Sequence, residues 1–244
     1  MTRSPQHGIA VLFLLSAMVI GTAIDLAAQG DPSITGLLRE IQKQSDSRGK
    51  ITQVWWFPEE FWTLSFRQSG SFNVEQQEAF LKAVRPYLVL AVSDGKIGPL
   101  GGAEFIDAAS LRATLQVLDG SGRSYAPLAD EQLTADVKNL GALLKSMLVN
   151  MLGALGQGTH MFFFPSAASD GTAIAAATKE GGFAVRVGEE FFKWRLPLGS
   201  LLPLKTCPED GERMSGAWKY CPWHGKVLID IDKPDPNVRG IGAF

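Results

Sequence analysis

Apolar side chains along this 244-residue chain recur at two periods, one typical of helices and one typical of strands. The helical period of three to four residues is found in residues 33–44 and again in residues 133–155. A third helix is predicted over residues 74–84, because Asn73 followed by Gln76 forms a capping-box pattern at its start. The chain is therefore expected to contain at least three helices.

The two-residue period predicts short strands separated by turn residues. These strands are expected over residues 50–57, 61–67, 88–92, 111–118, 123–128, 159–164, 183–187 and 191–196. Ser93-Asp94-Gly95 predicts a turn, since such residues commonly occupy hairpin turns. Because strands and helices do not follow a regular βαβ order, we expect an α+β fold over residues 29–204, with an antiparallel or mixed sheet packed against helices.

The N-terminal segment has the charge and hydropathy of a signal peptide. Arg3 precedes an uncharged apolar run over residues 8–24, and Ala27 and Ala28 offer a small-residue cleavage site. Cleavage after Ala28 removes residues 1–28 and leaves no membrane span, so we expect an exported protein, periplasmic or extracellular. The alternative is an uncleaved membrane anchor, because an apolar run of this length is near the minimum that crosses a bilayer.

Composition agrees with a globular exported protein. The formal net charge is −2, with 45% hydrophobic and 20% charged residues, as in ordinary domains with a substantial core. Without a basic excess, we expect no nucleic-acid partner. The proline and glycine residues of segment 233–244 predict an irregular tail.

Both cysteines of the chain occur in two matched five-residue phrases near the C-terminus. The phrases are Cys207-Pro208-Glu209-Asp210-Gly211 and Cys221-Pro222-Trp223-His224-Gly225. In each phrase a second metal-binding side chain follows the cysteine by three residues. The four side chains that can form a tetrahedral zinc site are Cys207, Asp210, Cys221 and His224. Proline after the first ligand and glycine after the second favour a tight turn around one ion.

At these residues the chain resembles a zinc ribbon, a family whose two knuckles usually read Cys-Pro-x-Cys-Gly. The resemblance covers residues 205–230, with Asp210 and His224 in the places of two cysteines. It implies a small C-terminal module, residues 205–232, that serves as a structural staple or as an interaction module. It implies no catalytic activity.

A disulfide between Cys207 and Cys221 is the alternative closure of this module. Exported proteins form such bonds, and an even number of cysteines agrees with one. The two closures exclude each other, because a disulfide consumes both thiolates that zinc would bind.

Three of the six tryptophans lie within residues 54–62, beside Glu59 and Glu60. Exposed indoles next to carboxylates can stack on sugar rings, so Trp56 and Trp62 are candidates for a carbohydrate-binding or peptidoglycan-binding surface. The competing interpretation places these rings in the core, where large aromatic side chains supply much of the buried area. The adjacent carboxylates are a weak acid-base pair, because neighbouring residues need not converge on one substrate.

Other catalytic patterns are missing from the sequence, which has neither a Gly-x-Ser-x-Gly nucleophile elbow nor a complete phosphate-binding loop. We therefore expect an exported, non-enzymatic protein whose zinc-ribbon-like module binds a protein or an envelope component. One alternative is a metal-dependent hydrolase, in which Asp210 leaves the zinc and opens a position for water. The other alternative is the tryptophan-based carbohydrate binder.

Overall fold

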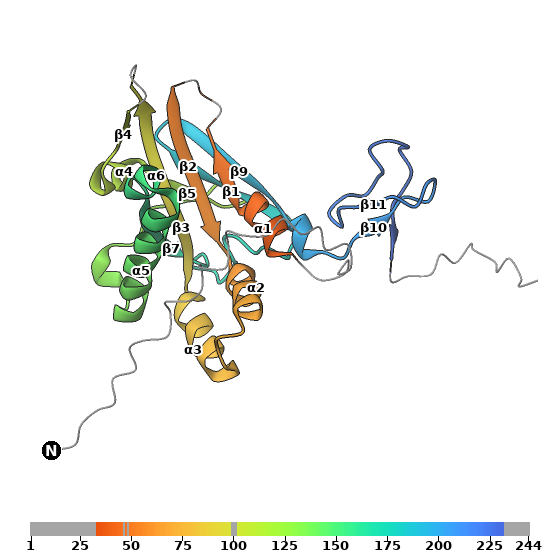
Figure 1. Ribbon diagram of the computed structural model, residues 1–244, viewed down its shortest axis with the longest axis horizontal. Helices are drawn as coiled ribbons and strands as arrows, with labels where there is room; N and C mark the ends of the chain where they lie inside the picture. The colour runs from red at the N-terminus through yellow and green to blue at the C-terminus, as the bar shows by residue number, and fades with distance from the viewer. Residues whose placement is uncertain (1–32, 46, 48, 99–101, 232–244) are drawn as a thin grey trace, which may run out of the picture.

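The computed structural model describes residues 33–45, 47, 49–98 and 102–231. The predicted signal peptide, residues 1–28, and the predicted tail, residues 233–244, lie outside these ranges. The described residues form helices and antiparallel sheets, an α+β fold as expected (Figure 1).

The first sheet has the strand order β1-β2-β3-β4, and β7 also pairs with β3. Its strands are β1 (Gln42–Gln44), β2 (Lys50–Phe57), β3 (Tyr87–Ile97), β4 (Ala103–Phe105) and β7 (His160–Pro165). Trp56, Leu90 and Phe162 are neighbours across β2, β3 and β7, and all three side chains are buried. This row of large apolar side chains lies at the centre of the main core.

The second sheet has the strand order β6-β5-β8-β9. Its strands are β5 (Gln116–Leu118), β6 (Ser124–Tyr125), β8 (Gly181–Val187) and β9 (Glu190–Leu196). The ring of Trp56 in the first sheet packs edge-on against Phe183, with 4.7 Å between the ring centroids, and Phe183 stacks on Trp194 at 4.9 Å. Aromatic packing therefore joins the two sheets.

The helices pack around the sheets. They are α1 (Ile34–Ile41), α2 (Glu59–Ser69), α3 (Val74–Val84), α4 (Ala108–Thr114), α5 (Ala135–Leu152) and α6 (Ala154–Gln157), with short 3₁₀ turns η1 (Asp130–Gln132) and η2 (Gly199–Leu201). Helix α5 lies against β7, and Gly141 permits close approach, since a Cβ there would be 3.2 Å from the ring of Phe163. Among the described residues, no helix combines the length and apolarity that crossing a bilayer requires.

A third, small sheet carries the C-terminal module and extends beyond α1 in Figure 1. Its order is β11-β10-β12, with strands β10 (Lys205–Thr206), β11 (Arg213–Met214) and β12 (Ile229–Asp230). A separate apolar cluster lies beside this sheet and consists of Cys207, Met214, Cys221 and Leu228. The chain enters the module after η2, where the carboxylate of Glu40 accepts hydrogen bonds from the backbone N–H groups of Gly199 and Ser200.

The strand expected over residues 61–67 is wrong, because these residues belong to helix α2. Phe61, Leu64 and Phe66 do not follow a strict two-residue period, so they match a strand pattern only in part. The stronger signals are a proline before the helix, two glutamates in its first turn, and Gly70 at its C-cap with φ 61°. These boundary residues favour a helix, and its apolar side chains are buried.

The turn expected at Ser93-Asp94-Gly95 is also wrong, because β3 continues through it. The carboxylate of Asp94 accepts a 2.6 Å hydrogen bond from the hydroxyl of Thr52 on the neighbouring strand. Gly95 lets β4 approach, since a Cβ there would lie 2.5 Å from the carbonyl oxygen of Glu104. Asp94 and Gly95 therefore have the residue types of a turn, although the first forms a cross-strand hydrogen bond and the second permits close contact between strands.

The strand expected over residues 111–118 is correct only at its end. Residues 108–114 form α4, whose N-cap Asp107 accepts hydrogen bonds from the N–H groups of Ala109 and Ser110. By contrast, β2 has the predicted bounds, and the capping box of Asn73 and Gln76 at the start of α3 is confirmed.

Candidate metal centre

The two cysteine phrases fold into turns with the same backbone hydrogen bonds. In the first, the N–H of Cys207 donates to the carbonyl of Glu212, and the N–H of Gly211 donates to the carbonyl of Cys207, both at 2.9 Å. The second turn makes the two equivalent bonds at Cys221 and Gly225. Both glycines have positive φ, 75° and 63°, which other residues rarely adopt. The predicted pair of tight turns is confirmed.

Each turn also directs backbone N–H groups at its own sulfur. Cys207 faces the amides of the residues two and three positions further on, and so does Cys221. In the second turn the N–H of His224 lies 3.4 Å from the Cys221 sulfur. Such N–H groups stabilise a thiolate, which is the form of cysteine that binds metal.

The folded turns bring three ligand atoms together. The ligand atoms of Cys207, Cys221 and His224 all lie within 4.8 Å of one another. His224 Nδ1 is 3.4 Å from the Cys207 sulfur and 3.6 Å from the Cys221 sulfur. Tetrahedral zinc, with Zn–S near 2.3 Å and Zn–N near 2.05 Å, separates sulfur from nitrogen by about 3.6 Å. These three side chains therefore lie close enough to hold a metal ion.

Asp210, the fourth ligand predicted from the sequence, lies beside this cluster but is not part of it. Its Oδ2 is 3.7 Å from His224 Nδ1, slightly more than the roughly 3.3 Å that two tetrahedral zinc ligands of this kind require. Its Oδ1 accepts a 2.9 Å hydrogen bond from the N–H of Glu212, and this bond lowers the pKa of the Asp210 carboxyl. An ionised carboxylate thus lies close to the position of a fourth ligand.

The two thiols differ in acidity. Burial raises the pKa of Cys207. At Cys221 the same burial is outweighed by hydrogen bonds from the backbone of His224 and Trp223 and from the Cys207 thiol, so the pKa of Cys221 is lowered. The surroundings of Cys221 therefore favour its thiolate, and a bound divalent cation would favour loss of the remaining proton.

Both cysteines are buried as free thiols, so the structure contains no disulfide between them. Two of the four residues in the module's apolar cluster are these cysteines, and the others are Met214 and Leu228. A core this small does not stabilise a domain by itself, and natural domains of this size depend on metals or disulfides. The apolar cluster of the module is therefore small, and the two cysteines make up half of it.

The tryptophans near Glu59 do not form a binding platform. Trp56 and Trp62 are 2% and 4% exposed and belong to the main core. Trp55 is half-buried and packs against that core. The carbohydrate-binding interpretation at these residues is wrong, because the two indoles are not available to a sugar.

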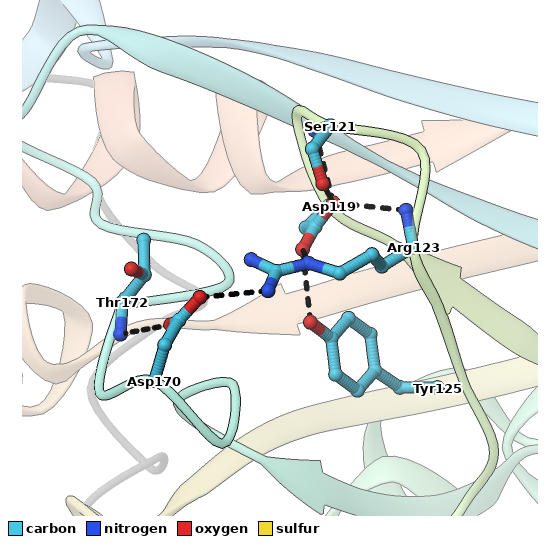
Figure 2. Close-up of polar contacts among 6 residues, drawn as sticks. All are labelled: Asp119, Ser121, Arg123, Tyr125, Asp170 and Thr172. Atoms are coloured by element: carbon cyan, nitrogen blue, oxygen red, sulfur yellow. Dashed lines mark hydrogen bonds and ion pairs between the residues drawn. The ribbon is translucent and has the colours of Figure 1, made fainter.

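A second polar cluster was not expected from the sequence (Figure 2). The Asp119 carboxylate accepts hydrogen bonds from the Ser121 hydroxyl, the Arg123 guanidinium and the Tyr125 hydroxyl at 2.6 to 2.9 Å. Arg123 also donates to Asp170 at 2.8 Å. The sequence shows the turn residues, but it does not indicate that Arg123 pairs with Asp170, 47 positions further along the chain.

This cluster lines a cleft of about 490 Å³ between the β5–β6 turn and residues 171–182. Arg123 is shared by two carboxylates, and Asp119 accepts bonds at both oxygens. Because its charges satisfy one another, the cluster acts as a brace between two loops.

Comparison with known proteins adds no relative: no protein-family model, curated protein or solved structure matches this chain. The resemblance to zinc ribbons therefore depends on the two turns and on the cluster of Cys207, Cys221 and His224.

Proposed function

We propose that the protein is exported and non-enzymatic, and that zinc closes its C-terminal module, which binds a protein or an envelope component. Cys207, Cys221 and His224 hold the ion, with Asp210 as the nearest fourth ligand. Zinc in this role links the two turns and gives the small module its stability.

The main support for this proposal is the location of the exposed apolar side chains. Ten large hydrophobic side chains of the described residues are exposed, and five of them lie within residues 218–231: Trp218, Tyr220, Trp223, Val227 and Ile231. Trp223 is 73% exposed, although it precedes the metal-binding His224 directly. Exposed aromatic side chains of this kind are enriched at protein contact sites.

The metal turn fixes the position of these aromatic side chains. Tyr220 precedes Cys221 and pairs with Val227 across an isolated antiparallel bridge, with Trp223 in the connection between them. The ammonium group of Lys219 lies 5.5 Å from the Tyr220 ring centre. A rigid loop with aromatic side chains loses little conformational entropy when it binds a partner.

The site supports a staple better than it supports catalysis. Two clefts lined by residues of the main body, 56–177 and 119–196, include none of Cys207, Cys221 or His224 in their linings. A catalytic zinc ion needs an open coordination position next to a substrate pocket.

A metal-dependent hydrolase is the second candidate, because three clustered protein ligands is also the number found in catalytic zinc sites. In that case water would take the position next to Asp210, whose ionised carboxylate could accept its proton. Metal-dependent turnover of an ester or peptide substrate, lost in His224→Ala, would favour this candidate.

Capture of partners from an envelope extract tests the proposal. The full chain is compared with Trp223→Ala and with Phe191→Ala, which removes a 52%-exposed aromatic side chain of β9, outside the module. We expect one partner to bind the wild type and Phe191→Ala but not Trp223→Ala. Equal capture by all three proteins would contradict the proposal.

Export is tested separately. The protein is produced in a bacterium with an envelope, and the mass of the recovered chain is measured. We expect a product that lacks residues 1–28, found outside the cytoplasm. A full-length chain in the cytoplasm would contradict export.

A further inference from the structure

A cavity of about 280 Å³ lies in the main body, away from the metal turns. It is enclosed by the first turn of α2, the end of α3, the start of β3 and the segment of residues 166–177. Its volume is near the lower limit for cavities that bind small organic ligands. None of the proposed roles of the C-terminal module uses it.

The lining of this cavity is more apolar than polar. Its floor consists of the buried side chains of Trp56, Phe57, Trp62, Val84, Leu88 and Val89. Five alanines form the opposite wall, all within residues 167–177. Alanine carries only a Cβ, so this wall leaves open the space that larger side chains would fill. A ligand's apolar part can therefore contact these alanines.

The charges at the cavity mouth do not cancel. Arg85 is fully engaged: its Nε and Nη2 donate to Glu59 at 2.8 to 3.0 Å, and its Nη1 donates to Glu78 at 2.6 Å. Of these, Arg85 and Glu59 line the cavity and neutralise each other. The remaining charged group in the lining is the carboxylate of Glu60.

Glu60 is half-buried, and no side chain among the described residues forms an ion pair or a hydrogen bond with its carboxylate. Burial raises the pKa of this carboxyl, and the negative charge of Glu59 adds to this effect, whereas a hydrogen bond from the backbone N–H of Glu60 itself acts in the opposite direction. A partly buried carboxylate without a cationic partner is stabilised by a cation that reaches it. The hydroxyls of Tyr87 and Ser166 also belong to the lining and can accept further N–H groups.

We propose that this cavity binds a small primary amine with an apolar body, whose ammonium group pairs with Glu60 and whose body contacts the alanines of residues 167–177. One positive charge balances the one unpaired carboxylate. A ligand with its own carboxylate would be repelled by Glu59 and Glu60. A neutral alcohol of the same shape would keep the apolar contacts but lose the ion pair.

The test uses 2-phenylethylamine and n-pentylamine as probes, with 2-phenylethanol and 3-phenylpropionate as neutral and anionic counterparts. Binding to the full chain is measured by titration calorimetry, and the site is located by amide chemical-shift changes. We expect both amines to bind at millimolar concentration or better, with shifts at residues 59–62 and 173–177. Weaker binding is expected for the alcohol and none for the anion.

Two variants and one control connect binding to the cavity. Glu60→Gln keeps the shape and removes the charge, so amine affinity should fall by about tenfold or more, while binding of the alcohol changes little. Ala175→Leu fills the cavity and should abolish binding of both. Glu75→Gln removes an exposed carboxylate on α3 outside the cavity and should change neither.

Three results would overturn the proposal. One is failure of both amines to bind the wild type. Another is equal amine affinity in the wild type and Glu60→Gln, with circular dichroism showing that both are folded. The third is a set of chemical-shift changes centred on other residues.

Discussion

The Nδ1 atom of His224 lies 3.4 Å from the sulfur of Cys207, although 17 residues separate the two in sequence. Two short strands bring them together: β10 ends just before Cys207, and β12 returns the chain beside it after the second turn. The ligands therefore come from two turns that the third sheet aligns. This arrangement leads to the first two predictions.

His224→Ala should lower the zinc content of the purified protein from about one equivalent. The reason is that His224 supplies the nitrogen nearest to both sulfurs. Metal analysis is combined with thiol counting under denaturing conditions. Glu209→Gln is the matched control, since it removes an exposed carboxylate from the other metal turn but outside the cluster.

The same measurement separates zinc from a disulfide. Zinc near one equivalent together with two titratable thiols supports coordination by Cys207 and Cys221. Absence of both metal and thiols would mean that a disulfide closes the module, and His224→Ala would then leave the module largely intact.

Removal of metal with a strong chelator should unfold the module and leave the main body folded. Without the ion, the module's apolar cluster retains only Met214 and Leu228 beside two thiols, whereas the main core is separate from it. Hydrogen exchange followed by mass spectrometry should show faster exchange over residues 207–228. Exchange in β2 and β3 is the internal control, and unchanged protection of the module after chelation would count against a structural metal.

Asp119→Asn should destabilise the main body by about 1–3 kcal/mol, because an amide cannot accept all the hydrogen bonds that this carboxylate accepts. Although burial acts in the opposite direction, hydrogen bonds from Ser121, Tyr125 and Arg123 lower the pKa of Asp119. The stabilisation is present above the unfolded pKa of 3.8 and is lost as the pH falls toward the folded pKa.

Urea unfolding at neutral and acidic pH measures this effect. The difference between wild type and Asp119→Asn should shrink below about pH 4. Asp130→Asn, at a side chain 73% exposed, is the control and should change stability little. A difference that stays constant with pH would show that the ionised form of Asp119 is not what stabilises the loops.

Glu60→Gln should make stability less dependent on pH. Because burial raises the pKa of Glu60, the folded state binds this proton more tightly than the unfolded state. The contribution of Glu60 is therefore most favourable below the ordinary pKa of 4.5 and decreases as the pH rises through the folded pKa. The glutamine variant should gain stability relative to wild type over this interval.

Thermal unfolding between about pH 4 and pH 7 tests the sign of this change. Glu75→Gln, at the exposed start of α3, should follow the wild type at every pH. A loss of stability of Glu60→Gln relative to wild type as the pH rises would contradict this prediction, because it would mean that the ionised carboxylate has a stabilising partner in solution.

Several elements could be predicted because their signals are local. The strand β2 has an apolar alternation bounded by Pro58, and α3 begins with a capping box, so both were predicted with correct bounds. The two metal turns were predictable for the same reason. Cysteine, proline and glycine at fixed offsets determine each turn within five residues.

Elements whose signals depend on distant residues were predicted wrongly. Asp94 is a residue type common in turns, but in the structure its carboxylate accepts a hydrogen bond from the Thr52 hydroxyl across the sheet. Gly95 is also common in turns, but in the structure β4 packs against it. Likewise, the sequence around Trp56 and Trp62 is typical of a sugar-binding site, but in the structure the second sheet covers Trp56 and α3 covers Trp62. In each case a long-range contact changes the role of a residue that the sequence leaves ambiguous.

The sequence by itself determined that two cysteine turns exist and which side chains they present, because each turn is stabilised by its own backbone hydrogen bonds. Only the tertiary structure decided that Cys207, Cys221 and His224 meet while Asp210 lies at the edge. It also decided that Glu60 lines a cavity and forms no ion pair with a side chain of the described residues. The physical reason is that distances between separate segments depend on sheet pairing and core packing, which involve the whole chain at once.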